Sequence, residues 1–201
     1  MILQALKNYY DRLAANPESN IAPEGWAEVE IPFVLVIDEQ GKLVQIEDTR
    51  EMLDKKLRAK PFLVPQGVKK SSGIAANLLW DSAVYVTGCY NTEDSDDAVI
   101  EKVAKRAPLQ HKAFIERIEE TLPDSPKRQA CLKFLTAIDE QQLAQFGVWE
   151  EIKQSNANLS IRFADNLHLY CQDEEVKSIY PTKDRESAEK VCSVTGKLDI
   201  P

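Results

Sequence analysis

Apolar residues at the start of the chain recur at the spacing of one helix face: Ile2, Leu6, Tyr9 and Leu13. The pair Asn16-Pro17 ends this pattern, because proline cannot continue a helix. The spacing therefore predicts an amphipathic helix over residues 2–15, whose apolar face packs against another part of the protein.

Short apolar runs follow this helix. Residues 31–37, IPFVLVI, are rich in β-branched and aromatic side chains, which are typical of strands. The turn sequence DEQG joins them to residues 42–47, so the two segments are predicted to form a hairpin. Two more strands are predicted over residues 59–64 and 83–87.

A helical spacing returns after residue 91, and prolines divide it into three predicted helices. The first ends at Arg106, the second runs over residues 108–122, and the third begins at Ser125-Pro126. Proline suits the first turn of a helix, because its missing N–H has no partner there anyway. This part of the chain is therefore predicted to be mainly helical.

The last part of the chain combines strand and helix patterns. Residues 158–163 and 167–171 are predicted to form a second hairpin, and a helical pattern runs from residue 174 to 191. The sequence then stops after a helix and a turn that lead to no further element. We therefore expect the chain to be a portion of a longer protein; the alternative is a frayed true terminus.

Together these elements predict an α+β fold: a small antiparallel or mixed sheet with hairpins, then a helical segment and a second short hairpin. Residues 1–90 are predicted to be a sheet-rich region that carries a basic loop. Residues 91–153 are the helical region, and residues 154–201 are a hairpin plus a C-terminal helix.

The composition is typical of a globular domain, because 43% of the residues are hydrophobic and 29% are charged. No run of apolar residues is long enough for a membrane span, and the first helix mixes charged residues among its apolar ones. We therefore expect a cytoplasmic protein that has neither a signal peptide nor a membrane partner.

The four cysteines are too widely spaced to form a paired zinc-binding motif: Cys89, Cys131, Cys171 and Cys192. Single cysteines scattered through an intracellular chain are most often small buried hydrophobic residues. The sequence therefore predicts no metal site and no cofactor.

Charge is distributed unevenly along the chain, which has a formal net charge of -8. The segment from Arg50 to Gly73 runs against this balance with seven basic and two acidic residues. A basic segment in an acidic protein attracts a polyanion to one place and repels it elsewhere. We therefore expect a phosphate-bearing partner to bind here.

The sequence PQGVKKSSG, residues 65–73, provides the groups that a phosphate-binding loop needs: flexible glycines, lysines and hydroxyls. A mononucleotide-binding loop requires a glycine directly before its lysine, whereas Val68 precedes Lys69 here. The loop therefore does not predict nucleotide binding. A solvated basic turn is the alternative to nucleic-acid binding.

The sequence also contains residues that serve metal-dependent nucleases and base stacking in other proteins. Glu47-Asp48 and Asp81 could hold magnesium as in a nuclease, but no spaced nuclease motif contains them, and residues that end a strand are commonly solvated. No catalytic residue is therefore predicted. Trp26, Trp80 and Trp149 could stack on bases, although single tryptophans are more often core or interface residues, and Trp80 is predicted to lie in the core.

Several ordered motifs are shared with a known family: MILQALKNYYDRLA, IAPEGW, IPFVLVID, RAKPFLVPQGVKKSSGIAANLLWDSAVYVTG and CSVTG. On these motifs the chain resembles the large subunit of the type I-C CRISPR interference complex, Cascade. The resemblance is strong over residues 1–90 and looser beyond them. Because members of this family are several hundred residues long, the resemblance implies that the chain is an N-terminal portion.

The resemblance implies a non-enzymatic subunit that recognises the protospacer-adjacent motif (PAM) in double-stranded DNA and helps to start duplex opening. The implied partners are the 5′ handle of the guide RNA and the other Cascade subunits, including the one that caps the 5′ end of the guide. A helicase-nuclease is recruited later.

Under this interpretation the basic segment and the residues after it form the DNA-binding site. The side chains expected to reach base edges are Gln66, Ser71, Ser72 and Asn77, although asparagine is also a common turn residue. The remaining expected contacts are phosphate binding by Lys69 and Lys70, close backbone approach at Gly67 and Gly73, and electrostatic attraction by Lys55, Lys56, Arg58 and Lys60. The alternative is an acidic protein-interaction module whose basic loop docks on carboxylates of a protein partner.

Overall fold

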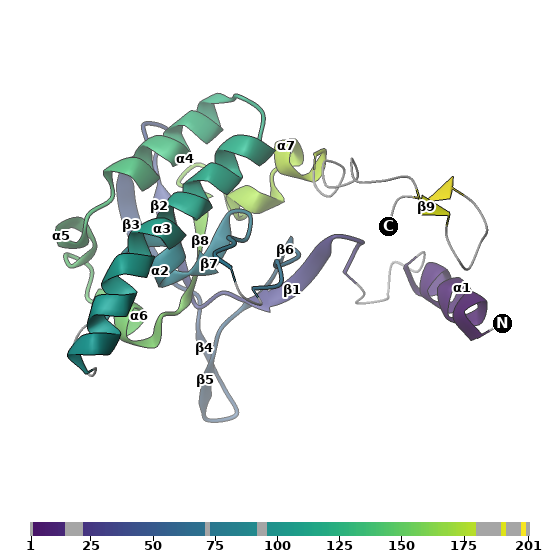
Figure 1. The fold of residues 1–201 in the computed structure, drawn as a ribbon, viewed down its shortest axis with the longest axis horizontal. Helices are drawn as coiled ribbons and strands as arrows, with labels where there is room; N and C mark the ends of the chain where they lie inside the picture. The colour runs from purple at the N-terminus through teal and green to yellow at the C-terminus, as the bar shows by residue number, and fades with distance from the viewer. Residues whose placement is uncertain are drawn as a thin grey trace.

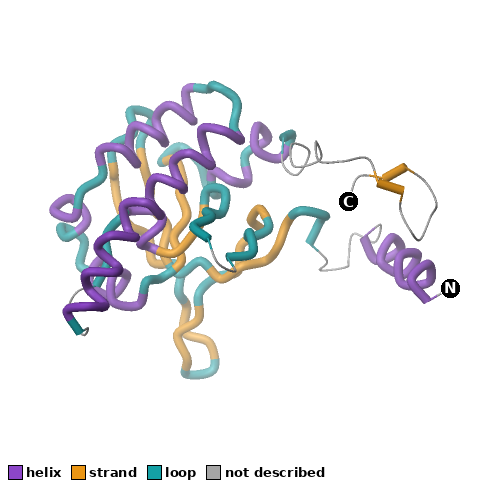
Figure 2. The backbone as a smooth tube through the Cα atoms, in the orientation of Figure 1, coloured by secondary structure: helices purple, strands orange, loops and turns teal. Residues whose placement is uncertain are grey.

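The computed structural model of the chain describes residues 2–14, 22–70, 73–91, 96–179, 190–191 and 198–199 (Figure 1). The helices in these ranges are α1 (Ile2–Ala14), α2 (Ala83–Thr87), α3 (Asp97–Thr121), α4 (Pro126–Ala137), α5 (Glu140–Leu143), α6 (Trp149–Ser155) and α7 (Glu174–Lys177), with a 3-10 turn η1 (Tyr170–Gln172). The strands are β1 (Trp26–Glu30), β2 (Phe33–Ile37), β3 (Leu43–Asp48), β4 (Glu51–Leu53), β5 (Lys56–Arg58), β6 (Pro61–Pro65), β7 (Trp80–Ser82), β8 (Asn158–Phe163), β9 (Lys190–Val191) and β10 (Leu198–Asp199). This mixture of helices and short strands confirms the predicted α+β class (Figure 2).

The largest sheet has four strands in the order β3-β2-β8-β7. The predicted hairpin is confirmed, because β2 pairs with β3 in antiparallel register. On its other side β2 pairs with β8 in parallel, and β8 pairs with β7 in antiparallel register. All five residues of β2 are buried, which explains why this strand reads as a continuous apolar run.

The predicted return strand at residues 167–171 is wrong, because this segment contains the turn η1 instead. Strands β2 and β7 already occupy the two edges of β8, so a strand from the following segment has no edge to pair with. The sequence pattern could not reveal this, since the competing strands come from more than seventy positions earlier.

The predicted strand at residues 83–87 is also wrong, because these residues form the short helix α2. All five of them are buried, and a short apolar run that is buried on every side has no period that separates helix from strand. Gly88 ends the helix with a left-handed φ of 74°, a conformation that glycine adopts without strain.

Helix α3 runs unbroken through Pro108, so the predicted boundary between two helices at this position is wrong. Ala107 and Phe114, on either side of the proline, are fully buried, and this packing outweighs the lost backbone hydrogen bond. Helix α4 begins as predicted, with Ser125 accepting a hydrogen bond from the backbone N–H of Arg128. Helices α3 and α4 pack against each other over the sheet (Figure 1).

Two smaller strand pairs lie outside this sheet. Strand β1 pairs with β6, and β4 pairs with β5 in a hairpin that projects from the body (Figure 1). The β4–β5 hairpin lies within the basic segment and was not predicted from the sequence. Pro61 and Pro65 lie in β6, and Gln172 Nε2 donates a hydrogen bond to the carbonyl oxygen of Leu63. These residues limit further pairing along the edge of β6.

One hydrophobic core joins residues from all three predicted regions, from Ile31 through Phe114 to Val176. Cys131 and Cys171 are fully buried, as predicted, and burial raises the pKa of the Cys171 thiol to about 12. Cys89 is half-buried, and Cys192 lies outside the described residues.

The two ends of the chain differ from the core. Helix α1 is confirmed, but its described apolar side chains are exposed: Ile2, Leu3, Leu6 and Tyr9. Most of the predicted helix at 174–191 lies outside the described residues, and residues 190–191 form β9, which pairs with β10. Within the described ranges, no helix is both long enough and apolar enough to cross a bilayer.

Candidate nucleic-acid interface

The segment that follows β6 carries most of the predicted DNA-contacting residues, and we call residues 66–77 the lysine loop. Its first end is fixed by two hydrogen bonds: Gln66 N donates to the carbonyl oxygen of Gly25 at 2.8 Å, and Trp80 Nε1 donates to that of Pro65 at 2.8 Å. Trp80 is 7% exposed, which confirms its predicted place in the core. The side chain of Gln66 is therefore carried on a backbone that the core holds in place.

The buried side chain of Asn77 links the two ends of the loop by a hydrogen bond. It is 6% exposed, and its Oδ1 accepts a hydrogen bond from the backbone N–H of Val68 at 3.0 Å. A Cβ atom at Gly67 would lie 3.3 Å from this Oδ1 and 3.3 Å from Cζ2 of Trp80. The geometry thus favours the turn role that the sequence analysis left open for Asn77, and it gives Gly67 a packing reason as well.

Asp81 holds the second half of the loop. This carboxylate is 2% exposed and accepts hydrogen bonds from Asn77 N at 2.9 Å and Ser82 N at 2.8 Å. Lys70 Nζ donates to both of its oxygens, at 2.5 and 2.7 Å, and lies 3.8 Å from the ring centroid of Tyr85. Lys70 is therefore tied to a buried charge and an aromatic face, and the structure gives it a part in shaping the loop.

The exposed residues of the loop differ in how far they are held by other parts of the protein. Gln66, Gly67, Lys69, Lys70 and Gly73 are exposed, although Lys70 Nζ is held by Asp81, and Ser71 and Ser72 lie outside the described residues. Lys69 makes no ion pair with any residue that the structure describes. Among the described loop residues, Gln66 and Lys69 are thus placed to meet a partner.

Arg106 is a further cation at this surface that the sequence analysis missed. It is exposed on α3, and its Nη2 lies 3.5 Å from the carbonyl oxygen of Gly73. The two residues are 33 positions apart, so no local pattern could have linked them.

The basic segment is divided in space. Lys55, Lys56 and Arg58 are exposed on the β4–β5 hairpin, which joins β6 near Lys60, whereas Lys69 follows the opposite end of β6. A five-residue strand rises about 3.3 Å per residue, so the two basic surfaces are separated by the length of the strand. The single electrostatic region expected from the sequence is therefore two surfaces.

Arg50, at the start of the basic segment, is bound elsewhere. Its Nη2 donates to Asp48 Oδ2 at 2.7 Å and to Glu151 Oε2 at 2.9 Å. These hydrogen bonds hold the pKa of both carboxyl groups below their ordinary values. Arg50 thus fastens β3 to α6, and its charge is largely compensated.

The carboxylates that suggested a nuclease each face a different cation. Glu47 binds Arg162 at 2.5 Å, Asp48 binds Arg50, and Asp81 binds Lys70. Within the described ranges, no three metal-ligating side chains gather into a cluster that could hold an ion. The described carboxylates therefore support ion pairs that stabilise the fold.

The family described as "CRISPR-associated protein (Cas_Csd1)" matches residues 6–200, which places the chain among the proteins of CRISPR systems. More narrowly, the chain belongs to the Cas_Csd1 family, the large subunit of the type I-C Cascade complex. The resemblance described above is thereby confirmed. Among curated proteins the chain has no match.

Proposed function

We propose that this chain is a non-enzymatic part of the surveillance complex and recognises the PAM in double-stranded DNA through the lysine loop. The observation that carries this proposal is the pairing of exposed Gln66 and Lys69 with a loop base fixed by buried groups. A guided complex leaves most sequence reading to base pairing and needs few protein contacts to bases. A short loop whose two ends are hydrogen-bonded to buried groups, and which carries one amide and the Lys69 cation, meets this need.

The described loop residues divide the work between base reading, phosphate binding and support. Gln66 carries a side-chain amide, which can pair with adenine in the major groove, and Lys69 binds a phosphate as a point charge. Lys70 and Asn77 hold the loop in shape. In this proposal the serines at 71 and 72 add hydroxyl contacts, and Gly73 allows close approach of the duplex.

Electrostatic attraction brings the duplex to this surface. Arg106 lies exposed beside the loop, and the cations Lys55, Lys56, Arg58 and Lys60 form a second exposed basic surface at the other end of β6. The net charge of -8 repels nucleic acid from most of the remaining surface. In this proposal the remaining surface binds the other Cascade subunits, including the one that caps the 5′ end of the guide. The 5′ handle of the guide RNA is contacted jointly by this chain and those subunits. Duplex opening begins at the PAM, and the helicase-nuclease is recruited afterwards.

PAM-library binding by the assembled complex tests this proposal. Gln66→Ala should lose about 1–3 kcal/mol on the preferred PAM and leave other PAM sequences nearly unchanged, because a bidentate base contact is lost. Gln145→Ala, an exposed glutamine after α5, is the matched control and should keep the wild-type ranking. If Gln66→Ala also keeps that ranking, the specificity lies outside the loop.

A second candidate function rests on the β4–β5 hairpin, whose cross-strand pair Met52 and Leu57 is 68% and 53% exposed. Exposed apolar side chains among cations suit a protein partner that has carboxylates around an apolar patch. A salt titration of duplex DNA binding separates the two functions. Affinity that falls steeply with salt supports DNA binding, and no binding at low salt supports the protein-interaction module.

A further inference from the structure

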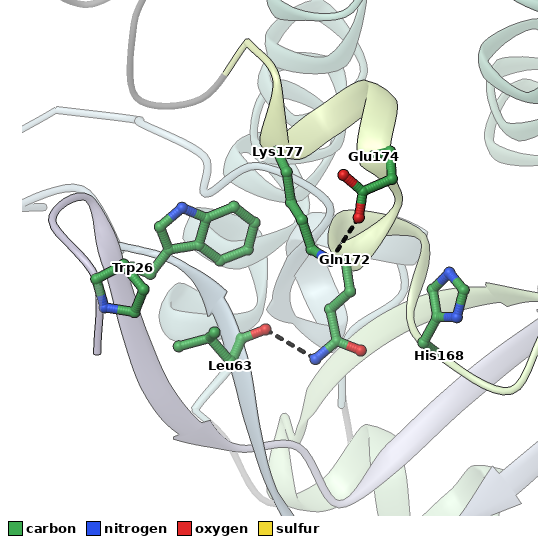
Figure 3. Close-up of a pocket in the computed structure, with 7 residues that line it drawn as sticks. Trp26, Leu63, His168, Gln172, Glu174 and Lys177 are labelled. Carbon is green, nitrogen blue, oxygen red and sulfur yellow. Dashed lines mark hydrogen bonds and ion pairs between the residues drawn. The ribbon is translucent and has the colours of Figure 1, made fainter. Parts of the chain in front are cut away.

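A pocket of about 540 Å³ lies between the β1–β6 pair and the segment that contains η1 and α7 (Figure 3). Trp26 forms one wall and His168 lies on the opposite side, while Leu63 and Gln172 lie between them (Figure 3). Lys177 and Glu174 form the rim. The volume is within the usual range of pockets that bind small molecules or single groups of a polymer.

The polar groups around the pocket already bind each other. Gln172 Nε2 donates to the Leu63 carbonyl oxygen at 3.0 Å, and Gln172 Oε1 accepts from Leu169 N at 3.1 Å. On the rim, Lys177 Nζ donates to Glu174 Oε1 at 3.0 Å. A small polar ligand would have to displace these bonds, whereas a flat ring needs only the apolar surfaces.

Two of the walls suit such a ring. The indole of Trp26 is half-buried, and the imidazole of His168 is 49% exposed with its Nε2 2.6 Å from Asp173 Oδ1. Aromatic rings on two sides of a cavity can hold a nucleobase by stacking, without preference for its identity. The compensated rim charges do not select for a phosphate inside the pocket.

The pocket is contiguous with the lysine loop. Trp26 pairs with Pro65 across the β1–β6 ladder, and the next residue of the loop, Gln66, donates its N–H to Gly25. The Trp26 wall is therefore within a few residues of the proposed contact points Gln66 and Lys69, where a strand released from a bound duplex can reach it. This continuity favours a base of the bound nucleic acid over an aromatic side chain of a protein partner.

We propose that the Trp26 pocket receives one unpaired nucleobase from the DNA strand released beside the PAM. This inference rests on the proposed function of the lysine loop. Base capture here would hold the first opened position of the duplex, since a stacked base cannot re-pair.

An abasic scan with the assembled complex tests the pocket. Target duplexes carry one preferred PAM, and one nucleotide at a time is replaced by an abasic residue in either strand, from the PAM through the seed. In the wild type, one position should lose roughly 5- to 150-fold in affinity, the value of one stacked base. Trp26→Ala should show a similar loss on intact DNA and no further loss at that abasic position. Trp26→Phe keeps a ring and should retain most of the affinity.

Two further variants keep the test decisive if Trp26→Ala folds poorly. Leu63→Trp fills the cavity from its floor, and His168→Ala removes the exposed opposite wall; each should abolish sensitivity to the same abasic position. The proposal is overturned if no abasic position lowers the affinity of the wild type, or if the affinity losses from Trp26→Ala and from the abasic position are additive. It is also overturned if Trp26→Ala releases a protein subunit from the complex. If the pocket test fails but Gln66→Ala still changes the PAM ranking, only the pocket proposal is wrong. If Gln66→Ala leaves the PAM ranking unchanged, the proposed function of the lysine loop is wrong as well.

Discussion

Lys70 and Asp81 are eleven positions apart in the sequence, yet Lys70 Nζ lies 2.5 Å from Asp81 Oδ1 in the buried base of the lysine loop. The same carboxylate accepts the backbone N–H groups of Asn77 and Ser82. One buried charge thus fixes both the return of the loop and the side chain of its second lysine. The two neighbouring lysines therefore differ in structure, because Lys70 Nζ is paired with a buried carboxylate, whereas Lys69 makes no ion pair with a described residue.

Separate alanine variants of the two lysines should have different effects. Lys69→Ala should reduce the slope of log affinity against log salt by about 0.9 for duplex DNA, with unchanged stability. Lys70→Ala should lower the free energy of unfolding by about 1–3 kcal/mol, because it leaves a buried acceptor without its cation. Salt titration and urea unfolding measure the two effects, and equal behaviour of both variants would contradict the assignment.

The hairpin cations should contribute affinity without sequence preference. Changing Lys55, Lys56 and Arg58 to Gln should weaken binding to every PAM sequence alike, with a slope change of about 0.9 for each cation that contacts phosphate. Thermal stability should be unchanged, because the described hairpin residues are exposed. Lys102→Gln with Lys133→Gln, on the exposed surfaces of α3 and α4, is the control, and an equal loss there would show only a general charge effect.

Two glycines of the loop provide a matched pair of substitutions. Gly67→Ala places a Cβ 3.3 Å from Asn77 Oδ1 and should cost about 1 kcal/mol of stability and blur PAM discrimination, because the loop must shift. Gly73→Ala meets no described atom within 4 Å and should leave the free energy of unfolding unchanged, so it is the control for stability alone. Urea unfolding and the PAM library give the two results; a Gly67→Ala variant with wild-type discrimination would argue that loop shape does not control reading.

Arg50 should give the fold a measurable dependence on acid. Its hydrogen bonds lower the pKa of Asp48 and Glu151 from ordinary values of 3.8 and 4.5, so their stabilising contribution is present above about pH 4.5 and is lost as the pH falls through the lowered values. Arg50→Met should lower the free energy of unfolding by about 1 kcal/mol at neutral pH, a modest value because water screens the exposed Glu151.

This difference between wild type and Arg50→Met should shrink as the solution is acidified. Urea unfolding across a pH series measures it, and Lys105→Met, which breaks the exposed Lys105–Glu101 pair, is the control with a smaller effect. A stability difference that stays constant down to strongly acidic pH would assign the role of Arg50 to its packing on Phe33, 4.4 Å from the ring centroid, and not to its charge.

The sequence alone determined the features that depend on neighbouring residues. The spacing of apolar residues identified helix α1 and helix α4, the run IPFVLVI with its turn identified the β2–β3 hairpin, and ordered motifs identified the family. Each of these signals is contained within a short segment, where the period of side chains or a turn residue fixes the backbone directly. The sequence also located the basic segment that contains Lys69, because counting charges along the chain needs no knowledge of distant residues.

The tertiary structure decided the features that depend on residues far apart in the chain. Strand β8 enters the sheet beside β2, which leaves residues 167–171 without an edge, and helix α3 passes through Pro108 because its buried neighbours hold it. The pairing of Lys70 with Asp81 and the pocket beside Trp26 likewise arise only when separate segments pack. Burial and ion pairing depend on distances in space, so a charge count along the sequence can locate a basic segment but cannot show which of its cations are already bound.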